Sequence, residues 1–123
     1  MVLLKLDIDF VVCKLPDTHG VNLTQDFVFL AKTDEEVSLV CPANLTPQNA
    51  IAIEAGWSVL KIEGVLDFGM VGVLAGIAGV LAEERISVFV VSTYNTDYIF
   101  VKTVDLSAAV QALTRNGYSI RDA

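Results

Sequence analysis

The sequence has little of what enzymes use for catalysis. Its 123 residues contain one histidine, His19, and two cysteines, Cys13 and Cys41. Neither cysteine has CxxC spacing or a histidine beside it, and no HxH, HxxxH or loop DxD pattern is present. Nucleophiles, general bases and metal sites depend on such clusters. We therefore expect no enzyme activity, no metal and no cofactor, and we expect both thiols to be reduced and buried.

Basic residues are also scarce. Eight lysines and arginines stand against fifteen aspartates and glutamates, and the net charge is −7. Such a surface repels phosphate backbones and anionic lipids. An RNA-binding sheet would also need basic and aromatic residues on exposed strands. We expect neither a nucleic-acid partner nor a membrane partner, whereas cationic or zwitterionic small molecules remain suitable ligands.

Long hydrophobic runs are missing as well. The uncharged apolar segment over residues 68–82 has fifteen residues, whereas a helix needs about twenty to span a bilayer. The apolar N-terminus alternates with polar residues and carries Asp7 and Asp9, which is unlike a signal peptide. Since 54% of the residues are hydrophobic, the chain can bury a core as one domain or two small subdomains. We expect a cytoplasmic globular protein.

The most informative stretch runs from Asp67 to Lys102. From Met70 to Glu84 apolar residues cover nearly the whole circumference of a helix, which predicts a buried helix. After Arg85 the period changes to two, which predicts a strand over residues 86–91. A polar turn, residues 92–97, leads into a returning strand that ends at Lys102.

The other elements follow from the same patterns. Gly56 suits the C-cap of a helix, Asp67 and Asp105 suit helix N-caps, and Gly117 suits a helix end. The predicted elements are one or two strands over 3–15, a loop over 17–26, strands on both sides of a turn at 33–36, a helix over 48–55, a strand over 57–63, a helix after Asp105 and a strand over 118–120.

Two parts of the chain look alike. The strand–turn–strand segment from Phe27 to Cys41 aligns with Val88 to Lys102, which places Glu36 on Asp97. The preceding strands agree too, VCKL at 12–15 with VLKI at 59–62. We therefore predict an internal duplication, with units at residues 1–55 and 56–123.

The predicted order strand–helix–strand–strand–helix–strand is that of the ferredoxin-like α+β fold, which hosts many functions. The helix GVLAGIAGVLAEERISVFVVST and the turn S-T-Y-x-T-D at Ser92–Asp97 resemble the ACT domain family, and the segments FVVCKLP and VSLVCP resemble a degenerate first ACT unit. The resemblance implies two tandem ACT-type units with antiparallel sheets and helices on one face. It also implies amino-acid binding at an ACT–ACT interface, and regulation rather than catalysis.

Within the family, the likeness to cytosolic arginine sensors and aspartate kinase regulatory domains implies a ligand site. The ligand turn maps onto Thr93, Tyr94 and Asp97, and a strand across the interface maps onto Ser87 and Val88. The loop before the central helix corresponds by position rather than by residue type, and contributes Asp67, Gly69 and Met70. A complete site would need a homodimer, because a single chain supplies one wall.

The chemistry of these residues suits a zwitterion. An α-amino acid needs an anionic oxygen for its ammonium group, which Asp97 could supply, and N–H donors for its carboxylate. The amides at the start of the central helix, residues 69–72, could supply those donors. In the alternative interpretation Asp97 only ends a tight turn, Thr93 and Thr96 satisfy its backbone, and Asp67 caps the helix. The chain would then be a ligand-free dimerisation or protein-interaction scaffold.

Overall fold

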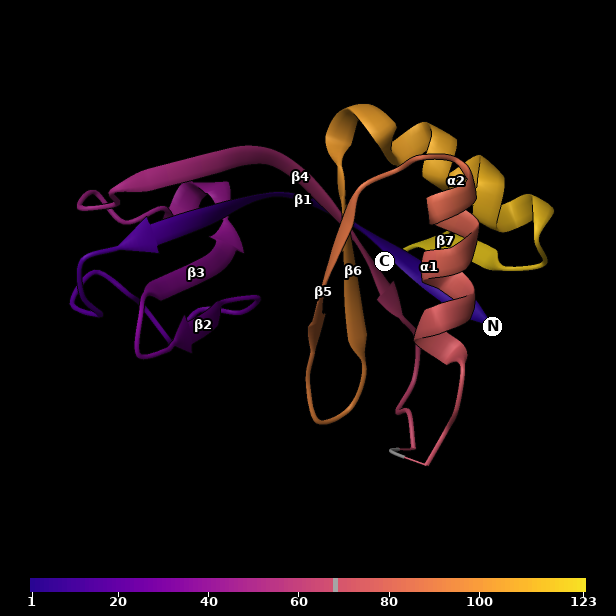
Figure 1. Cartoon of the computed structure of the whole chain (residues 1–123), viewed down its shortest axis with the longest axis horizontal. Helices are drawn as coiled ribbons and strands as arrows, with labels where there is room; N and C mark the ends of the chain where they lie inside the picture. Colours follow the sequence, from indigo (N-terminus) through magenta and orange to yellow (C-terminus); the bar gives the residue numbers. More distant parts are fainter. Residues whose placement is uncertain (68) are drawn as a thin grey trace. The chain divides into compact units, whose positions relative to one another are not determined.

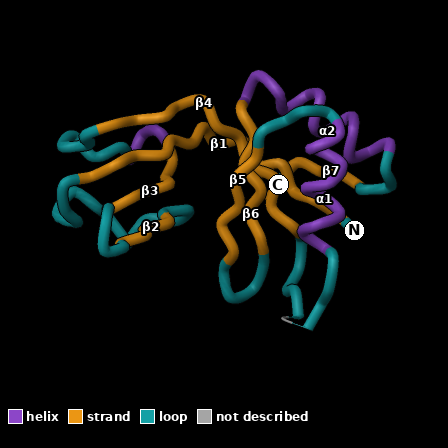
Figure 2. The backbone as a smooth tube through the Cα atoms, in the orientation of Figure 1, coloured by secondary structure: helices purple, strands orange, loops and turns teal. Residues whose placement is uncertain are grey.

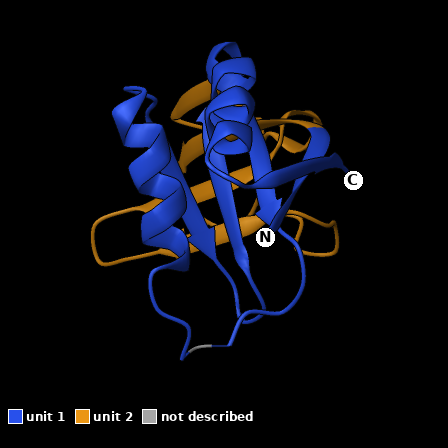
Figure 3. Cartoon of the chain, turned by 90° about the vertical axis from the view of Figure 1, so that its right-hand side faces the viewer, with its two compact units in different colours: residues 1–7, 58–123 blue, residues 8–57 orange. Residues whose placement is uncertain are grey.

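The computed structural model describes residues 1–67 and 69–123. These residues form two compact units, which are coloured separately in Figure 3. Unit 1 contains residues 1–7 and 58–123, and unit 2 contains residues 8–57. The strands β1 (Val2–Leu15) and β4 (Ala52–Ile62) each contribute residues to both units.

Unit 1 holds the predicted strand–helix–strand–strand–helix–strand order (Figures 1 and 2). After β4 come the helix α1 (Val73–Glu83), the strands β5 (Val88–Ser92) and β6 (Asp97–Lys102), and the 3-10 turn η2 (Thr103–Asp105). The helix α2 (Leu106–Arg115) and the strand β7 (Ser119–Asp122) complete the unit. The predicted α+β fold with this order of elements is confirmed, whereas the arrangement as two tandem units stays a prediction.

The sheet of unit 1 explains why the first residues of the chain belong to this unit. Its strand order is β5–β6–β4–β1–β7, so β1 lies between β4 and β7. The β5–β6 pair is antiparallel, as predicted. In contrast, β7 runs parallel to β1, with Val2 opposite Ser119. The N-terminal strand therefore completes a sheet whose other strands lie far along the sequence.

Both helices of unit 1 pack on the same face of this sheet. Ile77 and Leu81 of α1 share one hydrophobic core with Leu113 of α2. The buried strand residues of that core are Leu3, Leu60, Ile62, Ile99 and Val101. Figure 3 shows the two helices side by side in front of the strands.

The prediction that α1 is a buried helix is wrong for most of its surface. Only Ile77 and Leu81 are fully buried, and the small residues Ala75, Gly79 and Ala82 are exposed. A helix that covers one face of a sheet buries one stripe only. Because the opposite stripe consists of alanine and glycine, the helix is apolar all round without being buried all round.

Unit 2 consists of strands with one short turn of helix. The strands β2 (Phe29–Lys32) and β3 (Val37–Pro42) form a hairpin that is extended by β1 and then β4, and η1 (Ala43–Leu45) follows β3. Its core contains Val11, Cys13, Leu15, Val37, Leu39 and Cys41. The sequence predicted either one long strand or two short strands near the N-terminus. The structure has one strand, because β1 is continuous over fourteen residues.

The helix predicted over residues 48–55 is wrong. The strand β4 begins at Ala52, and the Ile51 amide donates a hydrogen bond of 2.7 Å to the Lys14 carbonyl. Pairing with β1 therefore overrides the local helical composition. Gly56 does have the positive φ expected of it, +84°, but within a strand rather than at the end of a helix.

The two hairpins match each other one residue away from the predicted alignment. Lys32 pairs with Val37 in unit 2, and Ser92 pairs with Asp97 in unit 1. Glu36 therefore corresponds to Thr96, and Val37 to Asp97, because pairing register rather than residue type aligns hairpins. Thr33 and Thr93 begin equivalent turns, and each threonine amide donates to the carbonyl three residues on, Glu36 or Thr96.

Candidate functional site

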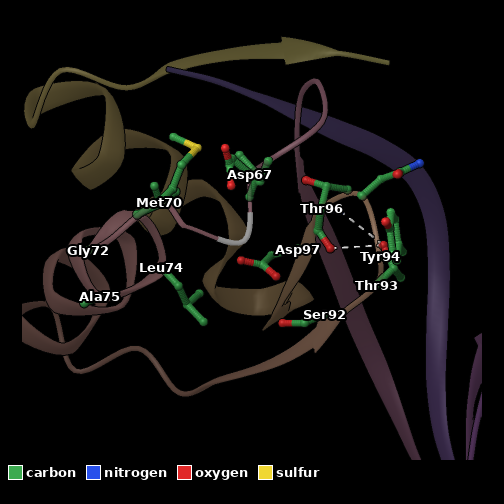
Figure 4. Close-up of a pocket in the computed structure, with 13 residues that line it drawn as sticks. Asp67, Met70, Gly72, Leu74, Ala75, Ser92, Thr93, Tyr94, Thr96 and Asp97 are labelled. Carbon is green, nitrogen blue, oxygen red and sulfur yellow. Dashed lines mark hydrogen bonds between the residues drawn. The ribbon is translucent and has the colours of Figure 1, made fainter.

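A pocket of about 280 Å³ lies at one end of unit 1 (Figure 4). Three segments form it: the loop after β4, the first turn of α1, and the turn between β5 and β6. Its lining residues are Leu66, Asp67, Met70, Gly72, Val73, Leu74, Ala75 and Ser92 to Asp97.

The start of α1 supplies unpaired backbone donors to this pocket. The N-cap residue is Gly72, whose φ of +81° favours glycine, and no side chain caps the helix. The first N–H groups of any helix have no partner within it, so the turn from Gly72 to Ala75 presents amides and the positive end of the helix dipole. An anion is favoured at this position.

Asp67 builds the loop in front of the helix. Its Oδ1 accepts a hydrogen bond of 2.7 Å from the Gly69 amide, and its carbonyl accepts one of 3.0 Å from the Met70 amide. The prediction that Asp67 caps the helix is therefore wrong, because it stands five residues before Gly72. Asp67 instead shapes the loop and lines the pocket.

The second wall is a turn held by its own threonines. The Thr93 hydroxyl donates to the Thr96 carbonyl (3.1 Å) and accepts from the Thr96 amide (3.3 Å). The Thr96 side chain, 4% exposed, donates to the Ile62 carbonyl at 2.8 Å. The Leu66 amide donates to the Asn95 carbonyl at 2.7 Å and so joins the two walls. The structural role expected of Thr93 is confirmed, whereas the Thr96 hydroxyl bonds to β4 rather than to the backbone of its own turn.

Asp97 is the acidic group that faces the helix start. It is half-buried at the beginning of β6, opposite Ser92 in the β5–β6 pair. In Figure 4 its carboxylate lies in the space between Ser92 and the first turn of α1. Within residues 1–67 and 69–123, no basic side chain forms an ion pair with Asp97. The pocket therefore offers a carboxylate on one side and helix amides on the other.

The structure brings together five of the eight predicted site residues. Asp67, Met70, Thr93, Tyr94 and Asp97 line the pocket. Gly69 lies in the same loop, with its amide bonded to Asp67, but does not line the pocket.

Ser87 and Val88 are at the start of β5, at the opposite end of the strand from Ser92, and they do not contribute to the pocket of their own chain. The sequence reasoning also missed Leu66, Val73 and Leu74. Their signal was weak, because apolar residues beside a helix start are read first as core residues.

Exposed apolar side chains occur in the loop and the turn that form the pocket. Val65 and Val71 lie in the loop before α1, and Val71 is 94% exposed. Met70 is also exposed, and Tyr94 in the turn across the pocket is 80% exposed. Large apolar groups gathered at one site indicate a surface that another molecule covers.

Other kinds of site find no support. In the part of the chain that the structure describes, no three histidine, cysteine or acidic side chains gather as metal ligands. None of the described helices is long and apolar enough to cross a membrane. Cys13 and Cys41 are buried and free, as predicted. Burial raises the pKa of both thiols, that of Cys41 to about 11.

Comparisons with known proteins agree with this fold. Among curated proteins, the bovine "cytosolic arginine sensor for mTORC1 subunit 1" is 31% identical over 99 residues, which cover 72% of this chain and 30% of the sensor. The chain thus spans about a third of the length of that relative. Among solved structures, Atu0741 from Agrobacterium tumefaciens has a TM-score of 0.86 at 27% identity, covering 99% of this chain and 92% of the other.

Aspartate kinase from Clostridium acetobutylicum shares the fold, with a TM-score of 0.62 at 16% identity over 88% of this chain and 32% of the kinase. The model of the ACT domain family matches residues 52–115, more than half of the chain and most of unit 1. The chain therefore belongs to the ACT domain family.

Proposed function

We propose that the protein is a non-catalytic regulatory module that binds a free amino acid in the pocket between α1 and the β5–β6 turn. The observation that carries this proposal is that Asp97 and the amides at the start of α1 line one pocket of about 280 Å³. The ligand ammonium group would bind Asp97, and its carboxylate would bind the amides from Gly72 to Ala75.

The relatives support a regulatory function in the cytoplasm. The curated relative is named a cytosolic arginine sensor, and the regulatory subunit of aspartate kinase from Thermus thermophilus shares the fold. Both names belong to amino-acid metabolism or sensing. The described lining residues of the pocket supply hydroxyl, amide and carboxylate groups.

A homodimer would complete the site. Within the described part of the chain, β5 is an edge strand with β6 as its only neighbour, and its sequence VFVVS carries no charge. The Thr93 amide bonds to the Thr96 carbonyl, so the alternation of the ladder points the amides of Val88, Val90 and Ser92 away from β6. Such an exposed, uncharged edge favours pairing with another strand.

Symmetric antiparallel pairing of β5 with β5 of a second copy, centred on Val90, would put Ser92 opposite Val88 of that copy. It would thereby bring the predicted residues Ser87 and Val88 to the pocket of the other chain. The exposed rim formed by Met70, Val71 and Tyr94 would also be covered. The ligand would then lie at an interface between two ACT units.

We also propose that residues 1–55 derive from a degenerate ACT unit and residues 56–123 from a complete one. The equivalent turns at Thr33 and Thr93 support this duplication. Val37 at the position of Asp97 indicates that the first unit has no equivalent ammonium site.

Thermal-shift measurements with each of the twenty amino acids test the binding proposal. We expect one amino acid, or a small group, to raise the melting temperature. Asp97→Asn should weaken binding at least about tenfold, since a charge-assisted hydrogen bond contributes roughly 1.5–3 kcal/mol. Asp105→Asn, which removes an acid of unit 1 outside the pocket, is the matched control.

A flat response to all twenty amino acids would contradict ligand binding. If the chain were nevertheless a dimer in solution, the exposed apolar rim would be explained by the scaffold function alone. Equal weakening by Asp97→Asn and Asp105→Asn would show that overall charge, rather than the pocket carboxylate, determines affinity.

A further inference from the structure

The first half of β4 presents an edge that no strand of the described chain occupies. β4 has two neighbours, β1 and β6. Two side-chain bonds locate β6 beside the second half of β4: the Thr96 hydroxyl to the Ile62 carbonyl, and the Ser58 hydroxyl with that of Thr103. Residues 52–56 therefore pair on one side only, with β1.

The backbone ladder shows which amides face the vacant side. The Ile51 amide donates to Lys14, and the Glu63 amide donates to Val2, so the same register with β1 holds at both ends. In an antiparallel ladder every second residue bonds to the same neighbour. The N–H and C=O groups of Ala52 and Glu54, which follow Ile51 in the extended strand, consequently point away from β1.

The side chains of this segment are exposed on both faces. Residues 51–56 are all exposed, and Ile51 and Ile53 are 63% and 53% exposed. Natural edge strands are usually protected by lysine, proline or several charges. Glu54 is the only charged residue of this segment, and no proline occurs in it.

Charge indicates what kind of strand would pair here. Unit 2 contains seven acidic and two basic residues, so it carries −5 of the net charge of −7. A second copy would bring the same negative charge and a second Glu54 to the edge. A cationic segment would instead be attracted to unit 2 and steered towards it.

We propose that residues 51–56 form a docking edge for an extended, cationic segment of a partner protein, which adds to unit 2 as a further strand. The partner backbone pairs with Ala52 and Glu54, as in other cases of strand addition. A basic side chain of the partner pairs with Glu54, and apolar side chains cover Ile51 and Ile53. This surface lies in unit 2, so it does not depend on the ligand pocket.

Fluorescence anisotropy with two labelled hexapeptides tests the proposal. One peptide alternates lysine and valine, and the other alternates glutamate and valine. We expect the full-length protein to bind the cationic peptide at least tenfold more tightly, and the affinity to fall as salt is added. Equal affinities, or no binding of the cationic peptide at millimolar concentration, would overturn the proposal.

Proline variants test the backbone geometry. Glu54→Pro removes an N–H that faces away from β1, so the protein should stay folded while peptide binding falls at least tenfold. Ala55→Pro removes an N–H that faces β1 and should lower the urea midpoint. A Glu54→Pro variant that binds the peptide as tightly as the natural chain would contradict the docking edge.

The charge and the alternative occupant are tested separately. Glu54→Lys should lower the affinity for the cationic peptide at least tenfold and raise the affinity for the acidic peptide. An unchanged preference between the two peptides would count against recognition at this edge. Sedimentation velocity of the peptide-free protein identifies self-pairing. A dimer that disappears in Glu54→Pro would overturn the cationic partner in favour of a second copy.

Discussion

Thr96 links the pocket turn to the core by one buried hydrogen bond. Its hydroxyl donates to the Ile62 carbonyl, and the residue is almost fully buried. Thr96→Val keeps the shape but leaves that carbonyl without its donor, which costs about 1–3 kcal/mol of unfolding free energy. Urea denaturation measures the loss. The control is Thr114→Val, at an exposed threonine whose hydroxyl donates to the Val110 carbonyl. It should lower the unfolding free energy less than Thr96→Val does. An equal loss would contradict the role of burial.

The Cys41 thiol makes stability depend on pH in the alkaline range. Burial raises its pKa from 9.0 to about 11 in the folded protein. Between these values the unfolded chain loses the proton first, so the unfolding free energy is unaffected by this group below pH 9 and falls as the pH rises towards 11. Chemical denaturation from pH 8 to 10.5 should show a steeper decline than in Cys41→Ala. Parallel curves would contradict the shift.

The position of α1 depends on a close approach between a glycine and a tyrosine. A Cβ added at Gly76 would lie 2.9 Å from the Tyr118 Oη, whereas one at Gly79 would meet nothing within 4 Å. Gly79→Ala should therefore stabilise the protein by about 0.5–1 kcal/mol through helix propensity. Gly76→Ala should not show this stabilisation, because its new Cβ would be too close to the Tyr118 hydroxyl. Thermal denaturation compares the melting temperatures of the two variants.

A double variant tests the cause of that difference. Tyr118→Phe removes the hydroxyl that Gly76→Ala would contact, so the alanine should be better tolerated in the phenylalanine background. If the two alanine variants stabilised the natural chain equally, Tyr118 would not hold α1 in place. Because the first turn of α1 lines the pocket, a displaced helix should also weaken ligand binding.

At the scale of the whole molecule, ligand binding and self-association should be coupled. Val90→Pro removes an N–H that points away from β6, so the β5–β6 pair should persist while pairing between copies is lost. Sedimentation velocity should show a monomer, and thermal shifts by the amino-acid ligand should decrease. Glu54→Pro, a proline on a different edge, is the control and should leave both unchanged. A Val90→Pro dimer with intact ligand response would exclude β5 as the interface.

Most element types could be predicted from local patterns. The helix after Met70, the strands on both sides of the Ser92–Asp97 turn and the helix after Asp105 all occur, within a few residues. The helix prediction for residues 48–55 failed. Their composition suits a helix, but pairing with β1 makes residues 52–55 part of a strand. Tertiary pairing overrides weak propensity wherever a segment is a strand of a larger sheet.

The sequence by itself determined the periods of the helices and strands, the turn residues and the absence of catalytic clusters, because each depends on neighbours a few positions apart. Only the tertiary structure decided that α1 buries one stripe, that β1 lies between β4 and β7, and that Asp97 faces the start of α1 across a pocket. Those features depend on strand register and on helix packing. Both are set by contacts between segments that are distant in sequence, and no local pattern contains them.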